Sequence, residues 1–216
     1  MSVRLVSISC PTLSDAISTA EDLIVYCARV SNPTNQTNMA TGSRLLRYCV
    51  DHGHWSVFEM ASMCVEIHTS RAIGRQMLRH RSFSFQEFSQ RYAAAPDTYP
   101  ALELRLQGKG RQGGDVVASL PAELHADVAA HFTDSMALYR RLLDHGVAAE
   151  SARMLLPELT QTTMYMHGTV RSWIHYLQQR CTSATQREHR AVAEGIRDVF
   201  TQAFPMISAA LDWSEA

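Results

Sequence analysis

The chain has 216 residues, 46% of them hydrophobic, and a formal net charge of −1, which suits one domain with a sizeable core and excludes a global basic field for non-specific binding to DNA or membranes. No apolar run approaches the ~20 residues that span a bilayer, and residues 1–20 lack the apolar core of a signal peptide. Because the five cysteines are scattered without a CxxC spacing, we expect a reduced, cytoplasmic protein. From its length we expect a single domain over residues 1–216.

The first half of the chain predicts three helices and one strand. Ser14 is expected to cap the first helix, and the polar stretch 31–42 after that helix is expected to form a loop. Gly53 is the stop signal of the second helix. Apolar and polar residues alternate over 60–68, which is the pattern of a half-buried strand. The three predicted helices cover residues 14–30, 43–52 and 69–80.

The second half begins with a long loop that is expected over residues 96–120. Pro121 can occupy the first turn of a long helix that ends near Gly146, and another helix runs to Pro157. Residues 159–166 have a composition that favours a strand, and two more helices close the domain. With few strands and no regular βαβ alternation, this order predicts an α+β fold. The closing helices are expected over residues 169–180 and 185–204.

The segment GKGRQG at residues 108–113 has the letters of the GxGxxG dinucleotide fingerprint. A phosphate-binding turn of that type needs a buried strand before it and a helix N-terminus after it. The preceding ALELRLQ carries two charges in seven residues, and the following DVVASLP reaches proline before a helix can form. We therefore interpret 108–113 as part of a loop and not as a Rossmann site.

Arginine dominates the basic residues, because of the 20 lysines and arginines only Lys109 is a lysine. A GC-rich coding sequence would explain this bias, and so would a need for planar, bidentate ligands of phosphates and ring carbonyls. Arg71, Arg75 and Arg79 have the i, i+4, i+8 spacing of one helix face, where like charges repel each other. This face leads into the aromatic and hydroxyl-rich segment 79–92, which favours a polyanionic ligand over a plain solvated face.

The second half of the chain has its own cluster of arginines. Arg153 lies on the predicted helix before Pro157, and Arg180 lies at the end of the helix 169–180. Arg171, His175 and Gln179 again follow the i, i+4, i+8 spacing and predict a second polar helix face.

Four segments of the chain, taken together, resemble one family. RHRSFSFQEFS at 79–89 fits the RHR-x7-S signature of the flavin-dependent thymidylate synthases. DHGHWSVFE at 51–59 resembles the family's HGH-x-(S/T)-x-F-E segment, and ARMLLP at 152–157 resembles its A-R-x-x-L-P segment. GTVRSWIHYLQQR at 168–180 resembles the stretch that ordinarily reads G-N-x-R-x-W/L-x-x-F-x-x-x-R. The resemblance covers roughly residues 25–200, and the chain is identified as a member of this family.

The resemblance implies an enzyme, an FAD-dependent methyltransferase that converts dUMP to dTMP by reductive methylation. In this family methylenetetrahydrofolate donates the carbon, and FAD relays hydride from NADPH. The implied fold is α+β, with helices around a mixed β-sheet. The implied assembly is a homotetramer whose sites are built from several subunits. Its partners would be small-molecule nucleotide and folate substrates, with no nucleic acid and no membrane.

The resemblance also implies residue roles, position by position. Arg180 matches the arginine that faces the uracil ring, where a fixed cation would favour ionisation of N3 and polarise the ring. His54 resembles a histidine near the flavin and the folate. The residues expected to bind dUMP are Gln76, Arg79, Glu87, Ser89, Gln90, Arg91 and Arg153. Those expected to bind FAD are Ser56, Arg79, His80, Arg81, Glu87, Thr169, Arg171 and His175, and no metal ion is expected.

Two positions depart from the family's pattern. Thr169 stands where an asparagine is usual, so one hydrogen bond to the flavin would be weaker or replaced. Ala184 stands where a histidine that approaches the flavin is frequent. These departures leave open an alternative function, a related flavin- and folate-dependent C5 modification of another pyrimidine nucleotide.

An enzyme with a covalent nucleophile is one rival class. Arg180 would lower the pKa of the adjacent Cys181, and Ser89 lies among arginines. A lone cysteine is nevertheless more often a small buried hydrophobe.

A metalloenzyme and a nucleic-acid-binding module are two further rivals. The HxH spacing of His52 and His54, together with His80, is a weak metal signal without a supporting set of acidic ligands. Stacking platforms for bases would come from Phe83, Phe85 and Phe88, but the near-neutral charge and the single lysine argue against them.

Overall fold

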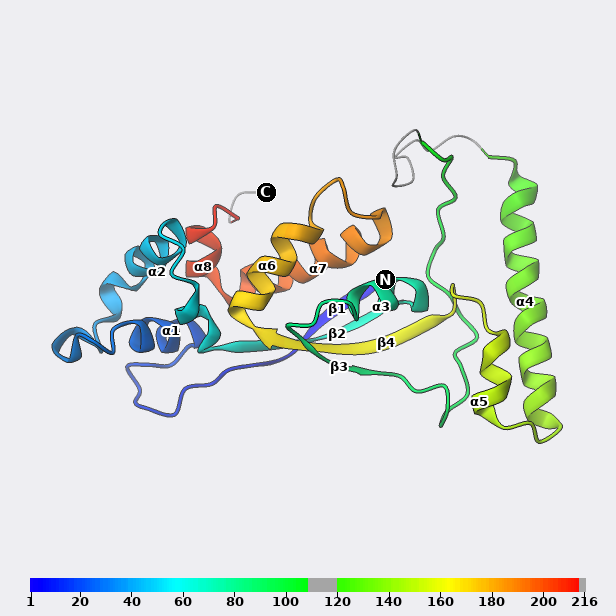
Figure 1. The fold of residues 1–216 in the computed structure, drawn as a ribbon, viewed down its shortest axis with the longest axis horizontal. Coiled ribbons are helices and arrows are strands. Elements are labelled where there is room, and N and C mark those ends of the chain that lie inside the picture. Colours follow the sequence, from blue (N-terminus) through cyan, green and yellow to red (C-terminus); the bar gives the residue numbers. More distant parts are fainter. Residues whose placement is uncertain (109–119, 214–216) are drawn as a thin grey trace.

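The computed structural model describes residues 1–108 and 120–213, and Figure 1 shows an elongated molecule built around one sheet. The strand order is β1–β2–β4–β3, and every neighbouring pair in it is antiparallel. The α+β prediction is confirmed, but the sheet is antiparallel and not mixed. The strands are β1 Ser2–Ile8, β2 Ser62–Ser70, β3 Ser84–Glu87 and β4 Gln161–Thr169. The helices are α1 Ala20–Ala28, α2 Gly42–Asp51, α3 Arg71–Met77, α4 Ala122–Asp144, α5 Ala149–Ala152, α6 Val170–Arg180, α7 Arg187–Ala203 and α8 Pro205–Ala210.

Helix α3 contacts β2, β4 and α7, and the other helices gather in three places around the sheet. Helices α6 and α7 lie along one face of it, with α7 against β1 and α6 following directly from β4 (Figure 1). Helices α1, α2 and α8 form a group at one end of the molecule, and α4 and α5 stand at the other end. Short 3₁₀ turns lie between these elements at Pro33–Asn35, Met39–Thr41, Trp55–Glu59 and Arg153–Leu155.

The main core forms between the central strands and the helices on that face. Alternate residues of β2 and β4 point into it, and Met63, Val65, Met164 and Met166 have no exposed surface. Trp173 of α6 is equally buried, and its indole N–H donates to the carbonyl of Met63 at 3.0 Å. That bond satisfies the one polar group of the largest core side chain and fixes α6 on β2.

Polar side chains occupy the opposite face of the same two strands. Glu66 lies opposite Tyr165 in the β2–β4 register, and the tyrosine hydroxyl donates to its carboxylate at 2.8 Å. Arg4 of β1 and His68 also contact Glu66, at 2.9 and 3.2 Å. The bond from Tyr165 and those from Arg4 and His68 hold the pKa of Glu66 below its ordinary value, against the opposing effect of burial. Glu66 therefore stays charged and ties three strand positions together.

A second, smaller core lies at the end of the molecule that holds α4. Phe132, Met136 and Tyr139 of α4 are buried there, and Tyr99 packs on Phe132 with ring centroids 4.5 Å apart. The Tyr139 hydroxyl accepts the backbone N–H of Ala95 at 3.1 Å. These contacts fix the segment after β3 against α4.

The predicted elements differ from the observed ones mainly at their ends. Helix α1 begins at Ala20, because Thr19 and Asp22 form a reciprocal capping box, so the prediction of Ser14 as N-cap is wrong. The predicted helix 69–80 is shorter, since β2 continues to Ser70, whose side chain caps α3, and α3 ends at Met77.

Strands β1 and β3 and the short helix α8 were not predicted, whereas β2, β4 and the long helices were. The loop prediction for 96–120 holds for residues 96–108 and 120, and most of the 108–113 segment lies outside the described residues. The prediction of one domain over residues 1–216 stays a prediction.

Candidate active site

The RHR motif lies on the turn between α3 and β3 and meets the end of α6. Arg180 Nε donates to His80 Nε2 at 2.9 Å, so the two predicted site residues are joined across 100 residues of sequence. Burial, and then the charges of Arg180 and His175, lower the pKa of His80 to about 4. The imidazole is therefore neutral near pH 7, with Nε2 as acceptor and its proton on Nδ1. The Tyr176 ring packs edge-on against it, with centroids 4.9 Å apart.

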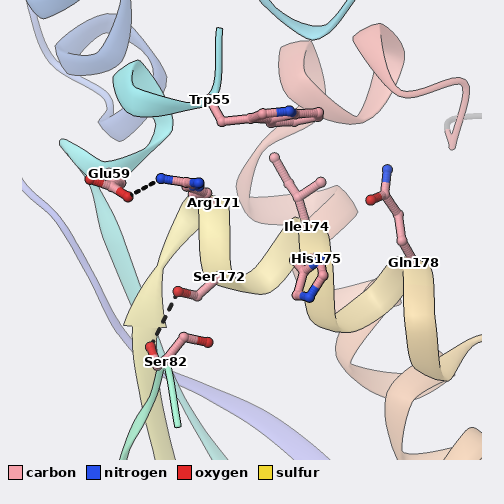
Figure 2. A pocket seen from close by; sticks show the side chains of 8 residues that line it. All are labelled: Trp55, Glu59, Ser82, Arg171, Ser172, Ile174, His175 and Gln178. Atoms are coloured by element: carbon pink, nitrogen blue, oxygen red, sulfur yellow. Dashed lines mark hydrogen bonds and ion pairs between the residues drawn. The ribbon is translucent and has the colours of Figure 1, made fainter. Parts of the chain in front are cut away.

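A cavity of about 420 Å³ opens beside the first turns of α6. Arg171, His175 and Gln178 have the spacing of one helix face and border this space (Figure 2). Arg171 forms an ion pair with Glu59 at 2.5 Å. The full lining is Trp55, Glu59, Ser82, Arg171, Ser172, Ile174, His175 and Gln178. An aromatic ring, a guanidinium, an imidazole and an amide around one space can hold a flat polar ring system.

Thr169 closes the N-terminus of α6 beside this cavity. Its Oγ1 accepts the backbone N–H of Ser172 at 3.3 Å, as a helix cap does. The Ser172 hydroxyl donates to the carbonyl of Ser82 at 3.2 Å and so ties the helix start to the RHR segment. Threonine and asparagine are both good N-caps, so the capping function survives the departure at Thr169. Ala184, the other departure, is exposed in the turn after α6.

A second cavity, of about 240 Å³, collects arginines from two distant segments. Arg71, Arg75 and Arg153 line it together with Gln90. Gln90 is only 3% exposed, and its Nε2 has no hydrogen-bond partner among the described residues. A buried amide donor without a partner costs free energy, and a bound ligand that accepts its hydrogen bond would remove this cost. Together with the guanidinium groups, the Gln90 amide therefore offers a set of donors to an anion.

Acidic residues hold the arginines of the second cavity in place. Glu87 of β3 pairs with Arg71 at 3.2 Å and accepts the Thr162 hydroxyl at 2.8 Å. Glu158 pairs with Arg75. The fold therefore supplies charge compensation that the linear sequence did not reveal.

The single arginine face predicted for Arg71, Arg75 and Arg79 is only partly observed. Arg79 lies beyond the last residue of α3 and is exposed, whereas the other two line the second cavity. Like Arg79, Arg81 is exposed, and neither of these two side chains makes a hydrogen bond or ion pair with another described residue. Arg91 pairs with Glu150 at 3.5 Å.

The residues expected to bind dUMP do not all converge within one chain. Gln90 and Arg153 line the second cavity, but Gln76 turns toward α7, where its amide bonds to Gln186. Ser89 lies in the turn after β3, and its Oγ accepts the backbone N–H of Arg91 at 3.4 Å.

The HGH segment contributes a residue that the sequence reasoning missed. Trp55 lines the first cavity, whereas His54 and Ser56 on either side of it are exposed and do not. The His54 ring lies edge-on to Tyr48, with centroids 5.7 Å apart. The sequence of a short 3₁₀ turn does not show which of its side chains faces a cavity, so the position of Trp55 could not have been predicted.

The geometry also bears on the rival classes. Burial raises the pKa of Cys181 to about 11, so the expectation that Arg180 activates this thiol is wrong. Phe83 is 9% exposed and packs on Trp173, with ring centroids 4.6 Å apart, so it is a core residue and not a stacking platform. Gly168 makes room for that ring, because a Cβ there would lie 2.5 Å from Phe83 Cδ1.

A metal-binding group of side chains and a membrane-spanning helix are both absent from the described residues. Within residues 1–108 and 120–213, no three histidine, cysteine or acidic side chains are grouped as a metal ion would require. Among the same residues, no helix combines the length and the apolar character of a membrane crossing.

Comparison with known proteins places the chain in a family. The sequence pattern of the Thy1 family, described as thymidylate synthase complementing protein, matches residues 12–206. A probable flavin-dependent thymidylate synthase of Paramecium bursaria Chlorella virus 1 is 47% identical, covering 99% of this chain and all of that protein. The flavin-dependent thymidylate synthase of a Synechocystis species is also 47% identical, over 99% of this chain and all of its own length.

A solved structure shows the same fold. The UMP/dUMP methylase PolB from Streptomyces cacaoi superposes with a TM-score of 0.82 and 27% identity, over 98% of this chain and 94% of that one. The family match and the two full-length relatives agree with the observed bond between the RHR turn and Arg180. This chain is therefore an enzyme that belongs to the flavin-dependent thymidylate synthase family.

Proposed function

We propose that this enzyme converts dUMP to dTMP by reductive methylation, with methylenetetrahydrofolate as carbon donor and NADPH as reductant. The observation that carries the proposal is the 47% identity, over the full length, to two proteins named flavin-dependent thymidylate synthases. The Arg180–His80 pair beside the RHR turn supports it, because activation of a uracil ring needs a fixed positive charge.

FAD is the proposed cofactor, and when bound it would supply hydride transfer from NADPH. The first cavity fits part of such a group, since Arg171 and His175 offer charge and hydrogen bonds and Trp55 offers an aromatic surface. Its volume of about 420 Å³ is near the lower end for ligand pockets. The remaining proposed contacts are Ser56, Arg79, His80, Arg81, Glu87 and Thr169, with His54 near the flavin and the folate.

The second cavity is the proposed site for the phosphate of dUMP. Arg153 and the unpartnered Gln90 amide would donate to phosphate oxygens there. Gln76, Arg79, Glu87, Ser89 and Arg91 are the other proposed nucleotide contacts. Phosphate recognition needs a dense set of donors, and this cavity offers one.

Arg180 is the proposed catalytic residue. A guanidinium stays protonated at any working pH, so it can stabilise negative charge on the uracil ring but cannot remove a proton. Because His80 binds its Nε, the two Nη groups remain for a ring oxygen. Neither Nη group bonds to another described residue.

We also propose a homotetramer with sites shared between subunits. Gln76 and the pair Gln90–Arg153 lie in different places within one chain, so a second chain would be needed to complete a site around one nucleotide. Light scattering of the purified protein should give the mass of four chains. A monomer that still turns over dUMP would contradict this proposal.

A second candidate function is methylation of UMP as well as dUMP. The superposition with PolB favours it, because that protein is a UMP/dUMP methylase of the same fold. The two candidates differ only in whether a ribose 2′-hydroxyl is accepted.

One experiment tests both candidates. The purified protein is first examined for a flavin absorption spectrum and then supplied with NADPH, methylenetetrahydrofolate and either dUMP or UMP. The product is identified by mass. We expect dTMP from dUMP, and Arg180→Ala, as the control, should abolish it. A flavin-bound, folded protein that methylates neither nucleotide would refute the proposed function.

A further inference from the structure

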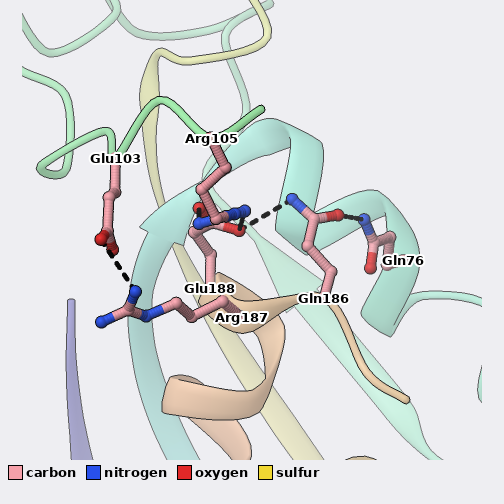
Figure 3. A network of polar contacts seen from close by, with 6 residues as sticks. All are labelled: Gln76, Glu103, Arg105, Gln186, Arg187 and Glu188. Carbon is pink, nitrogen blue, oxygen red and sulfur yellow. Dashed lines mark hydrogen bonds and ion pairs between the residues drawn. The ribbon is translucent and has the colours of Figure 1, made fainter. Parts of the chain in front are cut away.

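A chain of hydrogen bonds joins α6, α7 and α3 outside the two cavities described above. At its centre are Tyr176 and His189, whose side chains have no exposed surface. The tyrosine hydroxyl lies 3.0 Å from His189 Nε2, and His189 Nδ1 lies 3.2 Å from Gln76 Oε1. Gln76 Nε2 donates to Gln186 Oε1 at 2.6 Å, and Gln186 Nε2 donates to Glu188 at 2.9 Å (Figure 3).

The direction of these bonds is fixed from the Glu188 end. Arg105 binds both oxygens of this carboxylate, at 2.6 and 2.8 Å. Burial raises the pKa of Glu188, but the bonds from Arg105 and Gln186 outweigh burial and hold the pKa below its ordinary value. A carboxylate can only accept hydrogen bonds. Gln186 must therefore turn its amide nitrogen toward Glu188 and its amide oxygen toward Gln76.

The direction of the bond between Gln186 and Gln76 also fixes the proton on His189. Gln76 gives its amide nitrogen to Gln186 and therefore presents its oxygen to His189, which must carry a proton on Nδ1. His189 Nε2 is then the acceptor of the Tyr176 hydroxyl. Burial, with the charges of Arg180 and His80, lowers the pKa of His189 to about 4 and keeps the ring neutral.

We propose that His189, braced by Tyr176, is a positioning residue that holds the Gln76 amide with its NH₂ group as hydrogen-bond donor to the bound nucleotide. The inference rests on the proposed function, because it takes Gln76 as a dUMP contact. Gln76 Nε2 has two hydrogens, and Gln186 uses one of them. The other is available to an acceptor oxygen of the nucleotide. A flipped amide would place its own oxygen against that acceptor and repel it.

The tautomer of His189 can be measured without any turnover. In full-length protein labelled with ¹⁵N-histidine, His189 should show a protonated Nδ1 and an unprotonated Nε2 at pH 7, assigned by the loss of its signals in His189→Asn. A proton on Nε2 would overturn the proposal. Since this measurement does not depend on dTMP formation, its failure and that of the proposed function are distinguishable.

Nucleotide binding then separates positioning from simple packing. In calorimetric titrations with dUMP, His189→Leu should weaken binding about tenfold, the effect of losing one hydrogen bond. His189→Asn keeps a donor near the Nδ1 position and should recover most of that loss, whereas His189→Gln, whose amide reaches the Nε2 position, should not. Tyr176→Phe keeps the ring that packs on His80 and should show a smaller loss, because only the brace is removed.

Steady-state kinetics and melting temperatures complete the test. For His189→Leu we expect the KM for dUMP to rise with little change in kcat, and Gln76→Glu, which has no donor at that position, should have the same effect. The proposal would be overturned if His189→Asn and His189→Gln lost the same affinity for dUMP and if these losses followed the losses in melting temperature. His189 would then have a purely structural role.

Discussion

Replacing Arg180 by lysine separates the charge of this residue from its geometry. Arg180 ends α6 and donates from Nε to His80 at 2.9 Å, so its planar group is held in one orientation. A lysine has one ammonium on a flexible stem. It keeps the charge but loses the planar fork, which bonds to His80 through Nε and leaves both Nη groups for a uracil oxygen. Loss of a charge-assisted hydrogen bond costs about 1.5–3 kcal/mol, so dTMP formation should fall about 10- to 100-fold.

A matched control removes the alternative that Arg180 only stabilises a helix end. Arg141 lies in the last turn of α4, as Arg180 does in α6. A cation there contributes about 0.3–1 kcal/mol, and lysine keeps it. Arg141→Lys should therefore leave the rate of dTMP formation unchanged, and Arg180→Lys should hardly change flavin reduction by NADPH without dUMP. Near-normal dTMP formation by Arg180→Lys would remove Arg180 from the catalytic role.

Three further predictions concern stability and cofactor binding. Gly168→Ala would place a Cβ 2.5 Å from the Phe83 ring. The overpacking costs about 1–3 kcal/mol and should lower the melting temperature by about 2–10 °C. As a control, Gly195→Ala should not lower the melting temperature, because its Cβ would lie 3.4 Å from its nearest neighbour. Arg81→Ala removes an exposed side chain and should weaken FAD binding about 10- to 100-fold with an unchanged circular dichroism spectrum; full flavin content would contradict this role. The pKa of His80 is lowered from 6.5 to about 4, so as the pH falls the unfolded chain takes up this proton before the folded chain does. The free energy of unfolding, measured in urea, should therefore fall as the pH drops from 6.5 to 4. In His80→Gln this fall should be smaller.

The position of a strand in the sheet decided whether the sequence could predict it. The central strands β2 and β4 bury alternate residues between neighbours on both sides, and their composition or alternation predicted both. The strands that were missed, β1 and β3, are the two edges of the sheet. Most residues of β1 are exposed, so β1 carries no period-2 burial pattern. Strand β3 does alternate exposed and half-buried residues, but it has only four residues. Long helices with one buried face were predicted for the same physical reason as β2.

The candidate site was less predictable than the fold, because a motif gives positions along the chain but not directions in space. Arg75 and Gln76 are neighbours on α3, yet consecutive helical residues point about 100° apart. Arg75 accordingly lines the cavity with Arg153, while the Gln76 amide reaches the buried His189 on α7. His189 has no motif of its own, and only the fold brings it to Gln76. One helix thus presents guanidinium groups to one side and an oriented amide to another, and this division motivates the proposal that a second chain completes each site.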